Sequence, residues 1–194
     1  TAFLRKFKVW NKSSVLVAGG SGLVGVNLVE RLRKLNCSIR STYMNHKPPI
    51  MHDDVEYIQI DLRDSKKTQL VVKDIDYAFL SAASTSGAAT ISSNPMIHVT
   101  PNILINSLFF EACYQQKVKK ILWLSSTTGY PVSGDSFVEE DTMFDGDPFE
   151  KYYFVGWMKR FTEIICNMYS NKLKVTMPVI VLRPTNIYGP YDKF

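Results

Sequence analysis

The sequence predicts one α/β domain built on a doubly wound parallel sheet, and three observations support this fold class. Short apolar runs alternate with longer stretches of helical periodicity, which is typical of successive β-α-β units. The runs are hydrophobic throughout, as expected for strands that are covered on both faces. The chain has 194 residues, 45% of them hydrophobic, which is enough for one buried core.

Six apolar runs are the predicted strands, at residues 15–19, 38–42, 55–60, 76–82, 120–125 and 177–182. The first is followed by a glycine-rich loop and a leucine-striped helix that we expect to end near Asn36. Thr100 with Pro101, and Asp147 with Pro148, each match an N-cap followed by a first helical residue. They predict helices that run to about Gln116 and about Tyr169.

The longest irregular stretch lies between the last two predicted helices, from about Thr128 to Asp147. A loop of this length inside a compact domain is usually functional. It follows the carboxyl end of a strand, where open α/β sheets bind their ligands.

Composition narrows the class of partner. The net charge of +5 favours anionic ligands, but the basic residues are dispersed, so we expect no nucleic-acid partner and favour a phosphate-bearing small molecule. Cys37, Cys113 and Cys166 are far apart and odd in number, which indicates neither a disulfide framework nor a metal site. This cysteine usage fits a cytoplasmic protein.

The N-terminal segment, residues 1–12, is basic and places Phe3, Phe7 and Trp10 at helical spacing. It could contact an anionic membrane surface, or pack its aromatic rings against the edge of the domain, and base rates favour the second interpretation. No apolar run approaches the ~20 residues of a transmembrane helix, and no signal peptide is evident. We therefore expect one domain over residues 13–194.

The glycine loop carries the first functional signal. VLVAGGSGLVG places Gly19, Gly22 and Gly25 directly after a strand and directly before an amphipathic helix. In this context the three glycines allow the tight turn, the approach of a pyrophosphate and close helix–strand packing, while the helix N-terminus faces the phosphates. The motif predicts a Rossmann domain that binds NAD or NADP.

The second predicted strand bears on the choice between these cofactors. NAD-preferring domains usually end this strand with an acidic residue for the ribose hydroxyls, and Tyr43 stands there instead. Thr42, Arg40, His46 and Lys47 are nearby candidates to contact a 2′-phosphate. The sequence therefore leans slightly towards NADP, although basic residues at a strand end are often merely solvated.

The chain resembles the extended short-chain dehydrogenase/reductases of the NAD-dependent epimerase/dehydratase family, and within them the GDP-L-fucose synthases (GDP-4-keto-6-deoxymannose epimerase/reductases). The resemblance runs from Val15 to the last residue. It is carried by GGSGLVG, DLRD at 61–64, SAAS at 81–84, Asn102, LSSTTGYP at 124–131, Lys159 and LRPTNIYGPYDKF at 182–194.

The resemblance implies a set of binding residues. For the cofactor these are Gly19, Gly22, Leu23, Val24, Gly25, Thr42, Tyr43, Asp61, Leu62, Ala82, Ala83, Lys159 and Pro184. For the nucleotide-sugar substrate they are Ser84, Tyr130, Asn186 and Tyr191. It also implies a C-terminal substrate domain, of which only the beginning is present before Phe194.

The resemblance further implies catalytic roles for Ser126, against the reacting oxygen of the sugar, and for Lys159, on the nicotinamide ribose. The family's general base is a Tyr four residues before this Lys, and that position holds Val155. Tyr152 and Tyr153 are not obvious substitutes, because Tyr152 lies two helical turns from Lys159 and Tyr153 points elsewhere.

Two further family positions differ. The epimerisation Cys and His correspond to Thr128 and Tyr191, so double epimerisation is not expected. A redox step could still proceed with Ser126, Thr127, Thr128, Tyr130 or water relaying the proton. For Glu163 we expect only a pairing with Lys159 on the helix surface.

The resulting prediction is an NAD(P)-dependent oxidoreductase that acts on a nucleoside-diphosphate sugar, with redox at C4 of a GDP-sugar as one form. The alternative is a catalytically impaired dinucleotide-binding protein that acts as a sensor or partner subunit; a basic nucleic-acid-binding protein ranks last. The resemblance also implies a homodimer formed by two helices that carry Leu104, Leu108, Phe109, Phe161 and Ile165, although core packing explains these residues equally well.

Overall fold

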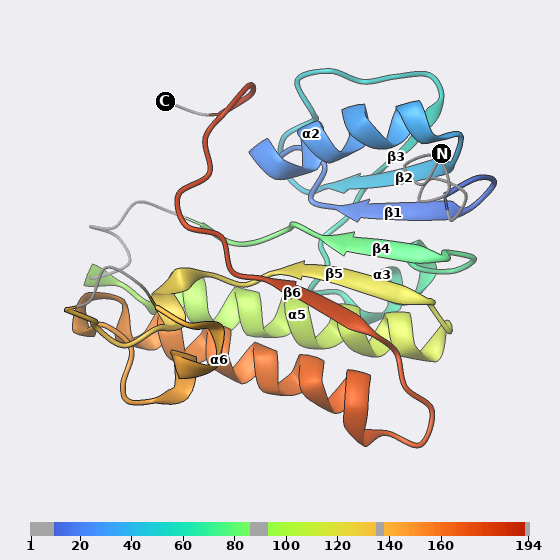
Figure 1. Ribbon diagram of the computed structural model, residues 1–194. Helices are drawn as coiled ribbons and strands as arrows, with labels where there is room; N and C mark the ends of the chain where they lie inside the picture. The colour runs from blue at the N-terminus through green and yellow to red at the C-terminus, as the bar shows by residue number, and fades with distance from the viewer. Residues whose placement is uncertain (1–9, 86–92, 135–137, 193–194) are drawn as a thin grey trace, which may run out of the picture.

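The computed structural model describes residues 10–85, 93–134 and 138–192 (Figure 1). Six strands form one sheet in the order β3-β2-β1-β4-β5-β6, and every neighbouring pair is parallel. The strands are β1 (Ser14–Ala18), β2 (Ser38–Tyr43), β3 (Val55–Gln59), β4 (Tyr77–Leu80), β5 (Lys120–Leu124) and β6 (Val179–Leu182). The predicted fold class is confirmed, and each predicted strand agrees with the structure to within two residues at either end.

Helices cover the two faces of the sheet unequally. One face carries α2 (Leu23–Leu32), and the other carries α3 (Ser65–Val71), α5 (Met96–Gln115) and α6 (Tyr153–Asn167) (Figure 1). Short turns complete the chain: η2 (Arg33–Leu35), η3 (Thr127–Gly129), η4 (Glu140–Phe144), η5 (Glu150–Tyr152) and the π turn η6 (Met168–Lys172). The strand order reverses between β1 and β4, which is the place where open α/β sheets bind their ligands.

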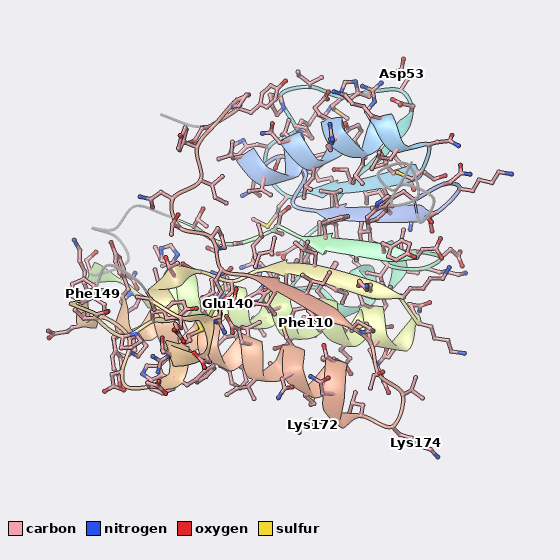
Figure 2. All side chains as sticks on the ribbon, viewed as in Figure 1. Asp53, Phe110, Glu140, Phe149, Lys172 and Lys174 are labelled. Atoms are coloured by element: carbon pink, nitrogen blue, oxygen red, sulfur yellow. The ribbon has the colours of Figure 1, made fainter. Side chains whose placement is uncertain are left out.

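Alternating residues of each strand supply two separate cores. In β1, Val15 and Val17 pack with α2, whereas Leu16 and Ala18 pack in the larger core beneath α3, α5 and α6. Phe110, labelled in Figure 2, lies fully buried in that larger core. Strands buried on both faces explain the continuous apolar runs of the sequence.

The N-terminal end of the described chain packs on the domain. The ring of Trp10 lies 6.0 Å from that of Phe79 and 5.1 Å from that of Tyr77. This contact agrees with the interpretation of an aromatic residue packed at the domain edge, while Phe3 and Phe7 lie outside the described residues. Among the described residues, no helix has the length and apolar character needed to cross a membrane.

The start predicted for α5 at Thr100 and Pro101 is wrong. The helix begins at Met96, and Pro101 lies inside it. Proline has no N–H to donate to the carbonyl four residues earlier, which would leave the oxygen of Ile97 unpaired. Ser84 compensates, because its Oγ donates to that oxygen at 2.9 Å. A side chain from outside the helix therefore allows α5 to begin before Pro101, whereas local rules start the helix too late.

The start predicted for α6 at Asp147 and Pro148 is also wrong. The chain first makes the short turn η5, and the α-helix starts at Tyr153. Pro148 is instead part of a tight contact, since a Cβ built on Gly156 would lie 2.5 Å from the Cβ of Pro148. The helix ends at Asn167 and continues as a π turn through Lys172, close to the predicted end near Tyr169.

Candidate cofactor and active site

The glycine loop joins β1 to α2 at the point where the strand order reverses. Gly19 has φ of +92°, and a Cβ there would lie 2.5 Å from the backbone nitrogen of Ala82 at the end of β4. A Cβ on Gly25 would lie 2.1 Å from the carbonyl oxygen of Gly19. Both positions therefore require glycine, because the turn and the helix leave no room for a side chain.

The N-terminus of α2 is open to a ligand. Its N-cap is Gly22, which offers no side chain to the unpaired N–H groups of the first turn. Thr42 instead supports the turn before it: its Oγ1 accepts from Gly19 N at 3.2 Å and its carbonyl accepts from Gly20 N at 2.7 Å. An uncapped helix N-terminus behind a fixed glycine turn suits a pyrophosphate.

Neighbouring residues of this helix terminus, Gly22 and Leu23, line two different cavities. The first, of about 250 Å³, lies over the carboxyl ends of β1, β2 and β4 and contains most of the predicted cofactor residues: Gly19, Gly22, Thr42, Tyr43, Asp61, Leu62, Ala82 and Ala83. The second, of about 590 Å³, continues from α2 to the segment after β6 and contains Leu23, Val24 and Pro184. Together they form a path from the strand-order reversal to the end of β6, and these residues fit a dinucleotide.

Among the described residues that line the first cavity there is one acid, Asp61, and it is paired with an arginine. Asp61 forms a two-pronged ion pair with Arg63, with N–O distances of 2.6 to 3.0 Å, and this hydrogen bonding lowers the pKa of Asp61. Arg63 also lines the cavity. The predicted role of Arg40 is not supported, because its guanidinium pairs with Glu56 and with the carbonyls of Val71 and Lys73.

Ser126 and Lys159 come together at the end of β5. Lys159 extends from α6 and donates from Nζ to the carbonyl oxygen of Leu124 at 2.9 Å, two residues before Ser126. The same ammonium lies 4.9 Å from the ring centre of Trp123. Ser126 N-caps the turn η3, where its Oγ accepts from the Thr128 nitrogen at 3.1 Å, which leaves its hydroxyl proton available to another acceptor.

The environment of Lys159 changes its acidity. Burial lowers the pKa of Lys159 from 10.5 to about 8, against a smaller opposing effect of Glu163. Removal from water disfavours the charged amine. A lysine with a perturbed pKa at the carboxyl end of a parallel strand is a candidate functional group.

Thr127 and Thr128 occupy the turn after Ser126. Thr127 is exposed, whereas the Oγ1 of Thr128 is buried and has no hydrogen-bond partner among the described residues. The backbone of Thr128 approaches α6 so closely that a Cβ on Gly156 would lie 2.5 Å from its carbonyl oxygen. Thr128 therefore lies against the residue that follows Val155.

Neither Tyr152 nor Tyr153 takes the place of Val155. The ring of Tyr152 packs at 6.0 Å on Phe149, which Figure 2 shows near the end of the molecule where the strands finish. The ring of Tyr153 packs on Phe154 and Trp157. Val155 itself is half-buried beside a cavity of about 390 Å³.

Glu163 departs from its predicted role as a surface residue. Its side chain is 8% exposed and pairs with Arg183, at 2.6 Å between Oε2 and a guanidinium nitrogen. It also accepts from Ser125 Oγ at 2.5 Å. The hydrogen bonds from Arg183 to Glu163 hold the pKa of that arginine above its usual range. Helical spacing links Glu163 to Lys159 but does not relate it to Arg183, which lies 20 residues further along the chain, so no sequence pattern predicts this pair.

The predicted substrate residues are distributed around the same edge. Ser84 is fixed by α5, since Asn102 exchanges two hydrogen bonds of 2.9 Å with its backbone. Tyr130 accepts from Arg183 at 2.6 Å. Asn186 and Tyr191 are exposed on the segment after β6, which the side chain of Asn27 holds to α2 through the carbonyl of Pro190.

Known proteins are similar to this chain in sequence or in fold. GDP-L-fucose synthase of Escherichia coli is 24% identical over 193 residues, which are 95% of this chain and 54% of that protein. The GDP-mannoheptose C4 reductase of Campylobacter jejuni, solved with NADP bound, aligns with a TM-score of 0.75 at 23% identity and covers 91% of this chain and 52% of its own. MoeE5, solved with UDP-glucose and NAD, gives 0.78 at 23% identity, covering 93% and 57%.

These structural likenesses establish the fold. The chain spans about half the length of the relatives that it matches. The sequence profile of one family, described as the NAD dependent epimerase/dehydratase family, matches residues 15–194. This match covers the residues of both cavities and of all six strands except Ser14, and the chain therefore belongs to the NAD dependent epimerase/dehydratase family.

Proposed function

We propose that the protein is an NAD(P)-dependent oxidoreductase that acts on a nucleoside-diphosphate sugar. The observation that carries the proposal is the junction at the end of β5, where the amine of the half-buried Lys159 is fixed on the Leu124 carbonyl beside the Ser126 loop. A site that only bound a dinucleotide would have no need for an ammonium partly withdrawn from water at this point, because removing a charged amine from water costs free energy.

The residues of this chain divide the work along the path of the two cavities. The glycine loop and the N-terminus of α2 hold the pyrophosphate, and Asp61 with Leu62 borders the adenine. Lys159 holds the nicotinamide ribose and provides positive charge. When bound, the dinucleotide accepts or supplies the hydride at the sugar carbon.

Ser126 acts on the sugar oxygen. Because its Oγ already accepts from Thr128 N, its proton points to the substrate and stabilises the charge that develops on that oxygen. The positive charge of Lys159 also stabilises the negative charge that develops on the sugar oxygen. With a valine at 155, Ser126 relays the proton of the sugar hydroxyl to water, and the hydroxyls of Thr127 and Thr128 can only pass a proton on, because an alcohol is a very weak base; this predicts a slow reaction.

For the cofactor we propose a preference for NADP. Tyr43 and Met44 line the cavity where an acid would bind ribose hydroxyls, and the acid that is present, Asp61, is paired with Arg63. Among the described residues that line this cavity, no unpaired carboxylate is present to repel a 2′-phosphate, and Arg63 supplies a guanidinium that suits one. The relative solved with NADP is in keeping with this preference.

For the substrate we propose a GDP-sugar that reacts at C4. The support is the naming of two relatives, a GDP-L-fucose synthase and a GDP-mannoheptose C4 reductase. Thr128 and Tyr191, in place of the epimerisation Cys and His, favour a redox step without double epimerisation.

For the quaternary structure we propose a homodimer through α5 and α6. Between these helices lies an apolar groove lined by residues that include Met96, Ile103, Phe154 and Trp157. Of the residues expected there, Leu104 is 43% and Phe161 47% exposed, whereas Phe109 is fully buried and belongs to the core. An exposed apolar strip of this kind is typical of a protein interface.

The test is a set of sugar nucleotides assayed with both cofactors. Purified protein is incubated with GDP-mannose, GDP-fucose, UDP-glucose or UDP-N-acetylglucosamine and NAD or NADP, and the absorbance of reduced nicotinamide is followed. The proposal expects turnover with at least one pair and its loss in Lys159→Met. Turnover in Lys159→Met at the parental rate would contradict the assigned role.

A second candidate function rests on Val155. Because Tyr152 and Tyr153 pack elsewhere, the chain could bind a dinucleotide without chemistry and serve as a sensor or partner subunit. This candidate expects tight NADPH binding and no turnover with any of the four sugars.

A further inference from the structure

Arg183, the first residue after β6, is at the centre of a contact network that ties three parts of the site together. Its guanidinium holds both oxygens of Glu163 on α6, at 2.6 to 3.2 Å. The same group donates to Tyr130 Oη at 2.6 Å and to the carbonyl oxygen of Glu140. Figure 2 shows Glu140 at the end of the molecule where the strands finish.

The backbone on either side of Arg183 holds the backbone on either side of Ser126. The nitrogen of Ser125 donates to the carbonyl of Leu182 at 2.7 Å, and that of Thr127 donates to the carbonyl of Pro184 at 3.3 Å. Ser126 lies between these two hydrogen bonds. The side chain of Arg183 then fixes the loop further along, at Tyr130 and Glu140.

We propose that the Glu163–Arg183 pair is a positioning unit for the proposed reaction, and that it fixes the Ser126 loop relative to Lys159 on α6. Glu163 is one helical turn from Lys159, so the pair links the helix of one reactive group to the loop of the other. The inference rests on the proposed function only for the identity of the reactive groups.

Stability alone is a weak explanation for this pair. Glu163 is 8% and Arg183 22% exposed, and removing paired charges from water offsets much of their attraction. The guanidinium N–H groups of Arg183 that do not bind Glu163 donate mostly to the loop after β5, at Tyr130 and Glu140. A displacement of about 1 Å at reacting atoms can cost about 100-fold in rate, which is the size of effect that such positioning can supply.

The test uses Arg183→Lys, which keeps a positive charge beside Glu163 but lacks the planar fork that reaches Glu163, Tyr130 and Glu140 together. We expect a melting temperature near the parent's, kcat lowered by about 100-fold, and an unchanged KM and NADPH dissociation constant. A second variant, Glu163→Gln with Arg183→Met, removes both buried charges. In this double variant no unpaired buried charge is left, and we still expect kcat to stay low.

A control separates the site from ion pairing in general. Arg33→Met with Asp54→Asn removes an exposed pair of 2.9 Å far along the chain from Ser126, and we expect parental kcat. Parental kcat in Arg183→Lys, or a kcat that recovers with the melting temperature in the double variant, would overturn the inference.

Hydrogen exchange keeps this inference separate from the proposed function. The amides of residues 127–130 are bonded to Pro184 and within the turn, so we expect them to exchange faster in both Arg183 variants, with β1 unchanged. If the parent turns over no sugar nucleotide, the proposed function fails, yet exchange still decides the positioning. Parental exchange of 127–130 in both variants would refute it.

Discussion

Replacement of Lys159 by methionine should stabilise the protein at neutral pH and remove its activity. The pKa of this lysine is lowered from 10.5 to about 8 because the amine is buried. At about 1.4 kcal/mol per tenfold change in the ionisation constant, this corresponds to a cost of about 3 kcal/mol at pH 7. The variant also loses the hydrogen bond to Leu124 and the contact with Trp123, which destabilises it by about 1 to 2 kcal/mol. The expected net gain is about 1 to 2 kcal/mol.

The sign of the pH dependence follows from the direction of the shift. Between pH 8 and 10.5 the unfolded chain binds more protons at Lys159 than the folded chain does, so the parent gains stability as the pH rises through this window. The advantage of Lys159→Met at pH 7 should therefore disappear, and then reverse, by about pH 10.5.

Urea denaturation from pH 7 to 10.5, followed by tryptophan fluorescence, measures this difference between variant and parent. Lys172→Met, at an exposed position at the end of the π turn η6 (Figure 2), is the matched control and should show a constant difference. Parallel stability curves for Lys159→Met and the parent would refute the reasoning, because they would mean that the amine is solvated like that of a surface lysine.

Four further changes probe the cofactor and reaction sites. Gly19→Ala should abolish NADPH binding measured by fluorescence, since its φ is +92° and the new Cβ meets Ala82, whereas Gly134→Ala, with open space around it, should bind normally. Ser126→Ala should lower kcat by about 100- to 1,000-fold, as loss of one oxyanion donor does, with NADPH binding retained. Val155→Tyr should raise kcat by at least about 100-fold, the usual contribution of a general base, because the neighbouring cavity of about 390 Å³ can take the ring; an unchanged kcat would place the proton transfer elsewhere. Tyr43→Glu should shift the ratio of the NADP and NAD dissociation constants towards NAD, and an unchanged ratio would remove this position from cofactor selection.

The sheet and the glycine loop could be predicted because their determinants are local. Continuous apolar runs mark strands buried on both faces, and the Gly19 and Gly25 positions follow from a turn and a close approach that only glycine allows. The helix starts could not be predicted from local rules. The start of α5 depends on Ser84, which is remote in sequence and supplies the hydrogen bond that Pro101 cannot.

The charged groups were the least predictable part of the site. Arg40 and Glu163 both have ordinary surface interpretations in the sequence, yet Arg40 is held by Glu56 and the end of α3, and Glu163 by Arg183. In each case the partner comes from a different element, so only the packed sheet and helices determine the pairing. The roles of Ser126, Thr128, Lys159 and the other site residues stay predictions.

Hydride transfer between a nicotinamide dinucleotide and a sugar nucleotide tests the central claim most directly. NAD or NADP is mixed with the four sugar nucleotides, and the appearance of reduced-nicotinamide absorbance is followed in the parent, Ser126→Ala and Lys159→Met. The account predicts slow turnover of at least one sugar by the parent and its loss in both variants. Tight dinucleotide binding with no change in absorbance for the parent and for Val155→Tyr alike would contradict it.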